Sequence, residues 1–157
     1  MSSDAIEHIA ARTLAHYEHH ADEFWQGTRD HDVSQNIAAL LHYIEATPPF
    51  ELLDFGCGPG RDLKTFQELG HHPTGLEGAE RLATMARAHS GCDVLQQNFL
   101  ELNLPTAHFD GVLDGTYTLQ QLDCNSKLLQ DSLYFFFCEV WVWQGDHVYS
   151  LAQPQAR

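Results

Sequence analysis

Three glycines at alternate positions follow an apolar run that ends in an acidic residue, in the segment 52–62 (LLDFGCGPGRD). They are Gly56, Gly58 and Gly60, with Cys57 between the first two. Because glycine has no Cβ, such a segment can turn sharply and let a ligand approach the backbone closely. A dinucleotide fingerprint has a longer interval before its third glycine, and a phosphate-binding loop continues with Lys-Ser/Thr. The segment therefore predicts a ligand-binding turn of another kind, with a plain tight turn as the alternative.

Two further groups follow the turn along the chain. Glu77 comes 17 positions after Gly60, close to the spacing at which an acidic side chain meets a ribose hydroxyl pair in βαβ nucleotide sites. A carboxylate accepts hydrogen bonds from two hydroxyls, an amide oxygen of Asn98 suits an adenine amino group, and Phe99 offers apolar surface to a purine. Taken singly, Glu77 is also explained as an exposed strand-end acid. Together the groups predict binding of an adenosyl group.

The elements that must position these residues alternate between strands and helices. Apolar runs predict strands at 50–55, 73–77, 93–97 and 109–114, and helical periodicity predicts helices at 62–69, ended by Gly70, and at 79–89. This alternation predicts an α/β fold with a Rossmann-like, doubly wound and mostly parallel sheet in a three-layer αβα arrangement. Ligands of such sheets bind at the carboxyl ends of the strands, where the glycine turn, Glu77 and Asn98 fall.

Two helices are predicted before the first strand. The first, at residues 4–25, is amphipathic, and the second begins at Asp32 or Ser34 and continues to about Glu45 before Pro48-Pro49 stops it. Between them, the mixed aromatic, glycine and charged residues of Phe24–Asp32 predict a loop. This loop either closes over a pocket or simply connects the helices at the surface. His16, His19 and His20 have a spacing that can hold a metal, but no third ligand type lies nearby, so we expect a solvated face and no metal.

Composition narrows the classes of partner. Eight Lys and Arg residues against 22 Asp and Glu give a formal net charge of −14, which disfavours nucleic acid and anionic membrane surfaces. The four cysteines, Cys57, Cys92, Cys124 and Cys138, form no CxxC pair, and the first ten residues lack a signal-peptide pattern. No apolar run reaches the roughly 20 residues that span a bilayer. We expect a single cytoplasmic domain over residues 1–157 that acts on a small molecule.

The motifs together resemble the class I S-adenosylmethionine-dependent methyltransferases, particularly the small bacterial-type members. The similar segments are 54–60 (DFGCGPG), 75–78 (GLEG) and 97–100 (QNFL), within a resemblance that covers about residues 17–112. The resemblance implies S-adenosylmethionine as cofactor and S-adenosylhomocysteine as product. It further implies a cofactor-binding core at 50–114 and an N-terminal part, residues 1–46, that carries helices and a lid.

The resemblance also implies roles for single residues. The three glycines with Cys57 would meet the methionine portion, Asp54 would organise the turn or reach the amino group through water, Glu77 with Gly78 would hold the ribose, and Asn98 with Phe99 the adenine. The family more often has Asp where this chain has Asn98. The lid would contribute Tyr17, Trp25 and Arg29, the last as a partner for a carboxylate, with a surface salt bridge as the alternative. The catalytic residues are not predicted, since methyl transfer from a sulfonium needs mainly alignment and a water-poor pocket.

The resemblance is expected to end after Val112. The tail, residues 115–157, has no Pro-Gly-Gly-type turn and is too short for the missing half of the sheet, so the fold is predicted to be incomplete there, as in a truncated or altered product. We expect a helix over Lys127–Leu133, a substitute strand over Tyr134–Trp143 that pairs with the fourth strand, and a short hairpin partner within Asp146–Leu151. Left unpaired, the fourth strand would be an exposed edge through which the chain could oligomerise.

Two functions follow from these patterns. The first is a methyltransferase that transfers a methyl group to a small-molecule acceptor. The second is a non-catalytic or truncated remnant that binds S-adenosylmethionine but lacks a substrate-binding half. A third class, a dehydrogenase-like nucleotide binder, is disfavoured by the glycine spacing.

Overall fold

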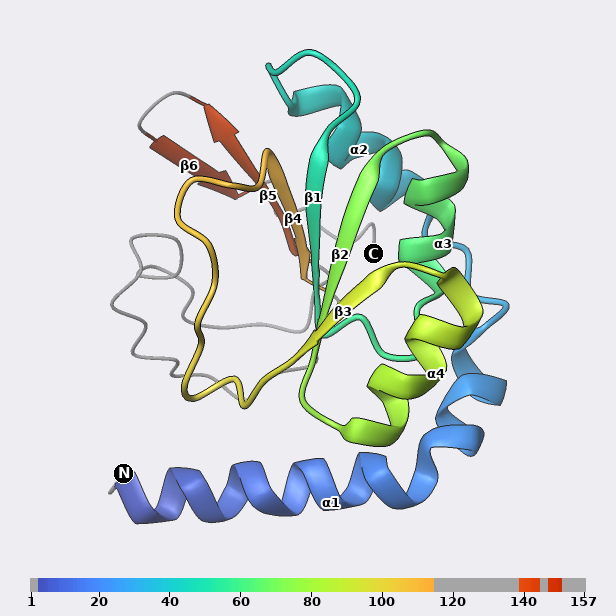
Figure 1. Cartoon of the computed structure of the whole chain (residues 1–157), viewed down its shortest axis with the longest axis vertical. Coiled ribbons are helices and arrows are strands. Elements are labelled where there is room, and N and C mark those ends of the chain that lie inside the picture. Colours follow the sequence, from blue (N-terminus) through green and yellow to red (C-terminus); the bar gives the residue numbers. More distant parts are fainter. Residues whose placement is uncertain (1–2, 115–138, 145–146, 151–157) are drawn as a thin grey trace, which may run out of the picture.

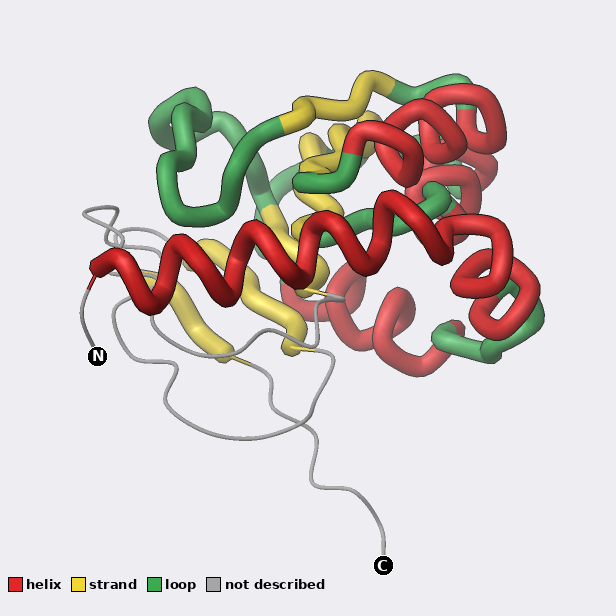
Figure 2. Tube along the Cα trace, turned by 90° about the horizontal axis from the view of Figure 1, so that it is seen from below, coloured by secondary structure: helices red, strands yellow, loops and turns green. Residues whose placement is uncertain are grey.

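The computed structural model describes residues 3–114, 139–144 and 147–150 of the chain (Figures 1 and 2). Its centre is one sheet with the strand order β3-β2-β1-β4-β5-β6. The first four strands are β1 (Glu51–Phe55), β2 (His72–Glu77), β3 (Asp93–Gln96) and β4 (Gly111–Asp114), and they pair with one another in parallel. The chain moves outward from β1 to β3 and then returns to the other side of β1. This reversal between β1 and β4 is the topological switch point at which ligands bind in such sheets.

Helices cover one face of the sheet. These are α2 (Ser34–Tyr43), α3 (Arg61–Glu68) and α4 (Glu80–Ser90), which lie together on one side in Figure 1. Leu52 of β1 and Leu113 of β4 pack there with Leu40 of α2 and Phe66 of α3, and all four side chains are fully buried. Because side chains alternate along a strand, Asp54 shares this face with Leu52. The sheet therefore directs Asp54 toward the helices.

The opposite face is covered by the long connection between β3 and β4. Buried Leu53, Phe55 and Leu76 of the sheet pack there with partly buried apolar residues that include Phe99, Leu102 and Phe109. The connection contains no helix and crosses back over the sheet (Figure 1). The helix predicted over Lys127–Leu133 lies outside the described residues.

The helix ends follow from local chemistry. Gly70, with φ of 87°, ends α3 as predicted: its N–H donates to Gln67 O at 2.9 Å, and that of His71 donates to Phe66 O at 3.1 Å. This pair of bonds is the Schellman arrangement, which needs a left-handed residue. At the start of α2 the N-cap position is Val33, and the Asp32 carboxylate instead accepts the N–H of Ser34 at 2.9 Å. Of the two predicted caps, Asp32 therefore supplies the hydrogen bond.

The first helix, α1 (Ser3–Thr28), is longer than predicted. The loop predicted for Phe24–Asp32 begins only after Thr28, because the aromatic residues at 24 and 25 pack against the domain and the Thr28 hydroxyl bonds Phe24 O at 2.8 Å. Inside α1, His20 has non-helical dihedrals (φ −115°, ψ 20°), so the helix kinks there. The longer part before the kink crosses the carboxyl edge of the sheet, and the shorter part turns up along α4 (Figures 1 and 2).

The strands after β4 complete the sheet in the antiparallel sense. β5 (Glu139–Gln144) pairs with β4, for example Leu113 with Val140, and β6 (His147–Ser150) pairs with β5. The predicted substitute strand and its hairpin partner are thus confirmed: β5 extends one residue beyond the predicted end at Trp143, and β6 lies inside the predicted range. The edge of β4 is covered because β5 takes the position beside it.

Candidate functional site

The glycine turn joins the carboxyl end of β1 to the start of α3. All three glycines have positive φ, 71° at Gly56, 51° at Gly58 and 86° at Gly60. The turn is held to β2 because the N–H groups of Gly56 and Cys57 both donate to Leu76 O, at 2.8 and 3.1 Å. Residues other than glycine rarely adopt such dihedrals, so the backbone shape itself requires the motif.

The glycines differ in what lies beside them. At Gly60 a Cβ would come within 2.8 Å of Ala86 Cα and 2.9 Å of Ala86 O in α4, so this glycine allows α3 and α4 to pack closely. At Gly58 the nearest atom to a Cβ would be Phe24 Cε1, at 3.2 Å. Cys57 is buried among the residues between the sheet and the helices, and this burial raises the pKa of its thiol. Gly58 is therefore the member of the motif that faces α1.

Glu77 connects the glycine turn to the next turn of the site. Its carboxylate accepts the N–H of Gly58 at 3.0 Å on Oε2, and the N–H groups of Gly78 and Ala79 at 2.8 and 2.9 Å on Oε1. The residue is 6% exposed. Burial raises the pKa of Glu77, while the three backbone hydrogen bonds oppose this change because they stabilise the charged form. One carboxylate thus fixes the relative position of two turns.

Carboxylates also occupy the N-terminus of α4. Glu77 binds the N–H groups just before the helix, and Glu18 of α1 accepts the N–H of Arg81 in its first turn at 3.1 Å. In dinucleotide sites the pyrophosphate binds the N-terminus of the helix after the first strand, which is α3 in this chain. The first turn of α3 carries Asp62, and its charge together with those of Glu77 and Glu18 would repel a phosphate. The site is suited to a ligand that donates hydrogen bonds or carries positive charge.

Asp54 is the most buried carboxyl of the site. The residue is 2% exposed, and its Oδ2 has no hydrogen-bond partner within the described residues. Burial and the negative charge of Asp62 raise the pKa of Asp54 well above its ordinary value, while the nearby Arg61 opposes them. Buried polar atoms almost always have a partner, so the orphaned oxygen indicates room for a donor from a ligand.

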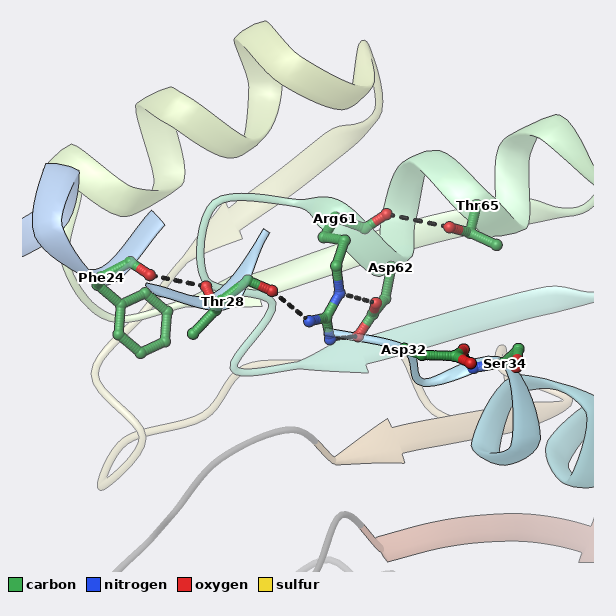
Figure 3. A network of polar contacts seen from close by, with 7 residues as sticks. All are labelled: Phe24, Thr28, Asp32, Ser34, Arg61, Asp62 and Thr65. Carbon is green, nitrogen blue, oxygen red and sulfur yellow. Dashed lines mark hydrogen bonds and ion pairs between the residues drawn. The ribbon is translucent and has the colours of Figure 1, made fainter. Parts of the chain in front are cut away.

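Arg61, directly after the turn, connects it to α1 (Figure 3). Its guanidinium donates to both Asp62 oxygens, at 2.7 and 3.0 Å, and to Thr28 O, at 2.8 Å. The side chains of Arg61 and Asp62 are 25% and 12% exposed. Thr28 is the last residue of α1, and a cation is favourable beside the carbonyls of a helix C-terminus. The end of α1 is therefore fixed to the ligand turn by a partly buried, bidentate arrangement.

Apolar residues of α1 lie over the two turns. Ala21 is fully buried against Ala79 and Leu82, with Leu14, Tyr17 and Phe24 packed around them. A Cβ on Gly78 would come within 2.6 Å of Leu14 Cδ2. Tyr17 meets Phe24 edge to face, with ring centroids 5.4 Å apart. α1 therefore excludes water from the glycine turn and from the loop after Glu77.

The other two predicted lid residues point elsewhere. The ring of Trp25 lies 4.7 Å from that of His89 in the last turn of α4, about 13.5 Å along this helix from its first residue, Glu80, by the rise of 1.5 Å per residue. Arg29 forms an ion pair with Asp30 at 3.2 Å, and its side chain is 52% exposed. The structure thus brings Tyr17 close to the turns and leaves Trp25 and Arg29 away from them.

Asn98 and Phe99 follow β3 as predicted. The Asn98 Oδ1 atom accepts the N–H of Leu100 at 3.1 Å, which shapes the loop, and a carbonyl oxygen has a second lone pair for another donor. Phe99 packs against Phe55, with ring centroids 4.8 Å apart. Phe99 therefore lies on the loop-covered face of the sheet, where it packs against the last residue of β1.

The described part of the chain has neither a metal-binding cluster nor a helix that could span a membrane. Within it, no group of three or more His, Cys, Asp or Glu side chains is arranged to hold a metal ion. The rings of His19 and His20 bond helix carbonyls one turn earlier, at 2.6 and 3.1 Å. No described helix is both long and apolar enough to cross a bilayer.

Several residues that shape the site were not predicted from the sequence. They are Leu14, Glu18, Phe24, Thr28, Arg61 and Asp62. The charged pair directly after the third glycine was visible as a signal, since polar residues at the start of the helix after a ligand turn often meet the ligand or its lid. Leu14 and Glu18 gave no signal beyond amphipathic periodicity, whereas Phe24 and Thr28 belong to the segment whose mixed composition indicated a loop that could close over a pocket.

Comparison with known proteins identifies the family. The sequence model of a family described as the methyltransferase domain matches residues 52–131, just over half of the chain. The chain belongs to this methyltransferase domain family. The match includes the glycine turn, Glu77 and Asn98, and it continues past Val112, where the resemblance was expected to end.

Relatives of this methyltransferase-domain chain are longer than it is. It is 32% identical over 114 residues to 24-methylenesterol C-methyltransferase 2 of Oryza sativa subsp. japonica. The aligned residues make up 68% of this chain and 29% of that protein. The crystal structure of a TehB-like SAM-dependent methyltransferase from Corynebacterium glutamicum is 20% identical, with a TM-score of 0.52 over 65% of this chain and 55% of that one. Magnesium protoporphyrin IX methyltransferase from Synechocystis PCC 6803, solved with bound SAH, is 14% identical, with a TM-score of 0.53 over 67% and 57%. These two structures show that the fold is shared.

Proposed function

We propose that the chain binds S-adenosylmethionine and transfers its methyl group to a small-molecule acceptor. The observation that carries this proposal is the set of carboxylates around the glycine turn: Glu77 bridges two turns, and Asp54 is buried with an orphaned oxygen. An adenosyl sulfonium offers ribose hydroxyls, an ammonium and a positively charged sulfur to such groups. A dinucleotide offers phosphates, which they repel.

The residues of this chain fit that cofactor. Glu77 would accept a ribose hydroxyl beside Gly78 at the acceptor position that its three backbone bonds leave, and Asn98 would accept from the adenine amino group. Gly58 leaves the backbone of the turn open to the methionine portion, to which Asp54 contributes negative charge. When bound, the cofactor supplies a methyl group made electrophilic by a sulfonium. The contribution of the protein is alignment and exclusion of water, the latter from Leu14, Tyr17 and Phe24 of α1.

The other expectations about the chain remain part of the proposal. We infer one domain over residues 1–157, because a chain of 157 residues is of single-domain size. We place it in the cytoplasm because Cys57 and Cys92 are free thiols. The net charge of −14 supports a partner other than nucleic acid. The similar proteins are methyltransferases, two of them named for a sterol or a porphyrin, and this supports methyl transfer without naming the acceptor of this chain.

The runner-up is a protein that binds the cofactor without catalysing transfer. It is supported by length, since the chain spans 29% of the similar curated protein and 55% of the first structural relative. Both functions predict cofactor binding, whereas only the first predicts that a labelled methyl group leaves S-adenosylmethionine for an acceptor. The acceptor is to be found by incubating the chain with labelled cofactor and a small-molecule extract, with a Gly58→Val chain as blank.

Cofactor binding is tested by isothermal titration calorimetry with S-adenosylhomocysteine. We expect saturable heat and a rise in melting temperature as ligand is added, by mass action. Gly58→Val and Glu77→Gln should each reduce affinity at least about tenfold, since the first blocks the turn and the second replaces an acceptor with a donor. Asp93→Asn, an exposed change at the amino end of β3, is the control. No heat and no stabilisation would rule out the cofactor, and normal binding by Gly58→Val would place the site elsewhere.

A further inference from the structure

The carboxyl of Asp54 is buried in the sheet beside the glycine turn, at a place where a negative charge is unfavourable. Asp54 lies near the carboxyl end of β1, between Gly75 of β2 and Leu113 of β4 in register. The strand alternation directs it toward the helix-covered face, where it is 2% exposed and one oxygen has no partner within the described residues. A carboxylate in this position is costly unless a positive group pairs with it.

The charges around Asp54 come from three elements. α3 contributes Arg61 and Asp62, β2 contributes Glu77, and β4 contributes Asp114. The Arg61 guanidinium is held by both oxygens of Asp62 and by Thr28 O, so its charge is largely matched by Asp62. The acidic neighbours add to the effect of burial, and together they raise the pKa of Asp54 well above its ordinary value. Without ligand, the surroundings thus favour the protonated carboxyl.

We propose that Asp54 selects ligands by charge: it gives up its proton when the ammonium of the cofactor's methionine portion binds beside it. The O–H bond of Asp54 breaks, its proton passes to the solvent buffer, and the resulting carboxylate pairs with that ammonium. No electrons are transferred. This inference rests on the proposed function, because it concerns the same cofactor site.

Charge selection separates two related ligands. S-adenosylhomocysteine carries an ammonium on its amino-acid portion, whereas 5′-methylthioadenosine has the same adenosyl group and sulfur but no amino-acid portion. Only the first can compensate an ionised Asp54. Its affinity should therefore rise with pH while Asp54 titrates, by up to about tenfold per pH unit. The affinity for 5′-methylthioadenosine should stay flat over the same range.

The test is calorimetry of the full chain between about pH 5.5 and pH 7.5, a range below the titration of ordinary amines. Each titration is repeated in two buffers with different heats of ionisation. With S-adenosylhomocysteine, the measured heat should differ between the buffers, which reports release of up to one proton per ligand. With 5′-methylthioadenosine the two buffers should give equal heats.

Two matched variants assign the proton. Asp54→Asn keeps the shape of the neutral carboxyl and should fold, yet its affinity for S-adenosylhomocysteine should no longer depend on pH and no proton should be released. Asp93→Asn, the same change on an exposed residue at the amino end of the sheet, should behave as the parent chain. This pair separates the effect of one buried carboxyl from that of the overall charge.

Several results would overturn the proposal. Proton release that persists in Asp54→Asn would assign the titration to another group, such as Glu77. Equal pH dependence for both ligands would remove the role of the amino-acid portion. Binding of S-adenosylhomocysteine with no proton release would reject the inference and leave the proposed function intact, whereas no binding at any pH would reject the proposed function as well.

Discussion

At the scale of single residues, the site depends on two acids with different tasks. Glu77 accepts three backbone N–H groups, so its charge holds two turns together, and one acceptor position of its carboxylate is left for a ligand. Asp54 has an oxygen without a partner in the described structure. An acid that accepts several backbone N–H bonds stabilises a fold, whereas one that is buried with an unbonded oxygen weakens it and is retained where function requires it.

This contrast predicts how Asp54 affects stability. Because its pKa is raised in the folded chain above the ordinary value of 3.8, the folded state holds a proton that the unfolded state releases, and stability falls as pH rises through this window. Asp54→Asn removes the titration. In the absence of ligand the variant should be more stable than the parent by about 1 kcal/mol at neutral pH, and the difference should shrink as pH approaches 4.

Urea denaturation at several pH values measures this difference. Asp93→Asn serves again as the control and should show the pH dependence of the parent. A gap between Asp54→Asn and the parent that grew toward acidic pH would contradict the direction assigned to the pKa.

At the scale of elements, the turns between strand and helix determine how closely the helices pack. Gly60 and Gly70 have nearly the same φ, 86° and 87°, but a Cβ at Gly60 would collide with the backbone of Ala86 whereas nothing lies within 4 Å at Gly70. The pair therefore separates backbone strain from packing.

Alanine at each position tests this separation. Gly70→Ala should cost about 1 kcal/mol, the strain of a left-handed residue with a side chain. Gly60→Ala should cost at least about 2 kcal/mol more, since α3 and α4 must move apart at Ala86. Chemical denaturation measures both values. Equal costs would mean that α3 accommodates the methyl group without moving from α4.

The attachment of α1 is a second property of an element. Its end is tied to the turn by Arg61, and its middle is tied to the start of α4 by Glu18, which accepts the Arg81 N–H, and by Asp22, which pairs with the Arg81 side chain. The Arg81–Asp22 pair is exposed, and such pairs contribute little. Glu18 acts as a capping acid on a helix of another segment, a stronger role.

Removal of this cap should loosen α1. We expect Glu18→Ala to lower stability by about 1 kcal/mol and to speed amide hydrogen exchange in the part of α1 before the His20 kink, because the N–H of Arg81 loses its acceptor. Glu23→Ala, an exposed change in the same helix, should alter neither. Unchanged exchange in Glu18→Ala would show that apolar packing of Leu14 and Ala21 alone holds the helix.

At the scale of the whole molecule, the sheet is completed by strands that run against the others. β5 and β6 cover the side of β4 that would otherwise expose unpaired backbone groups. Oligomerisation through the edge of β4 was predicted for the case in which that edge is unpaired. It would therefore require that β5 leave β4.

Truncation tests the cover directly. A chain that ends at residue 138 lacks both strands and should self-associate in a concentration-dependent manner, measured by light scattering after size-exclusion chromatography. A chain that ends at residue 150 keeps both strands and should elute as the full chain does. A monodisperse 138-residue chain with the elution of a single copy would show that β5 is not needed to protect β4.

The sequence by itself determined the features that depend on local chemistry. The glycine turn, the Gly70 helix end, the four parallel strands to within two residues at each end, and the presence of a substitute strand after β4 all follow from backbone preferences and apolar periodicity over a few residues, and the structure has them. The family resemblance likewise lay in short motifs. The length of α1 was predicted too short, because packing of Phe24 and Trp25 against the domain outweighs the loop-like composition of that segment.

Only the tertiary structure decided which residues meet. That Gly60 serves helix packing, that Glu18 caps α4 and that Arg61 holds Thr28 are contacts between segments distant in sequence, for which one sequence carries no signal. The orphaned oxygen of Asp54 is likewise a property of burial, which depends on all the surrounding elements at once. Local preferences place a carboxyl at the end of a strand, but only the assembled core removes it from water and makes its charge unfavourable until a positive group pairs with it.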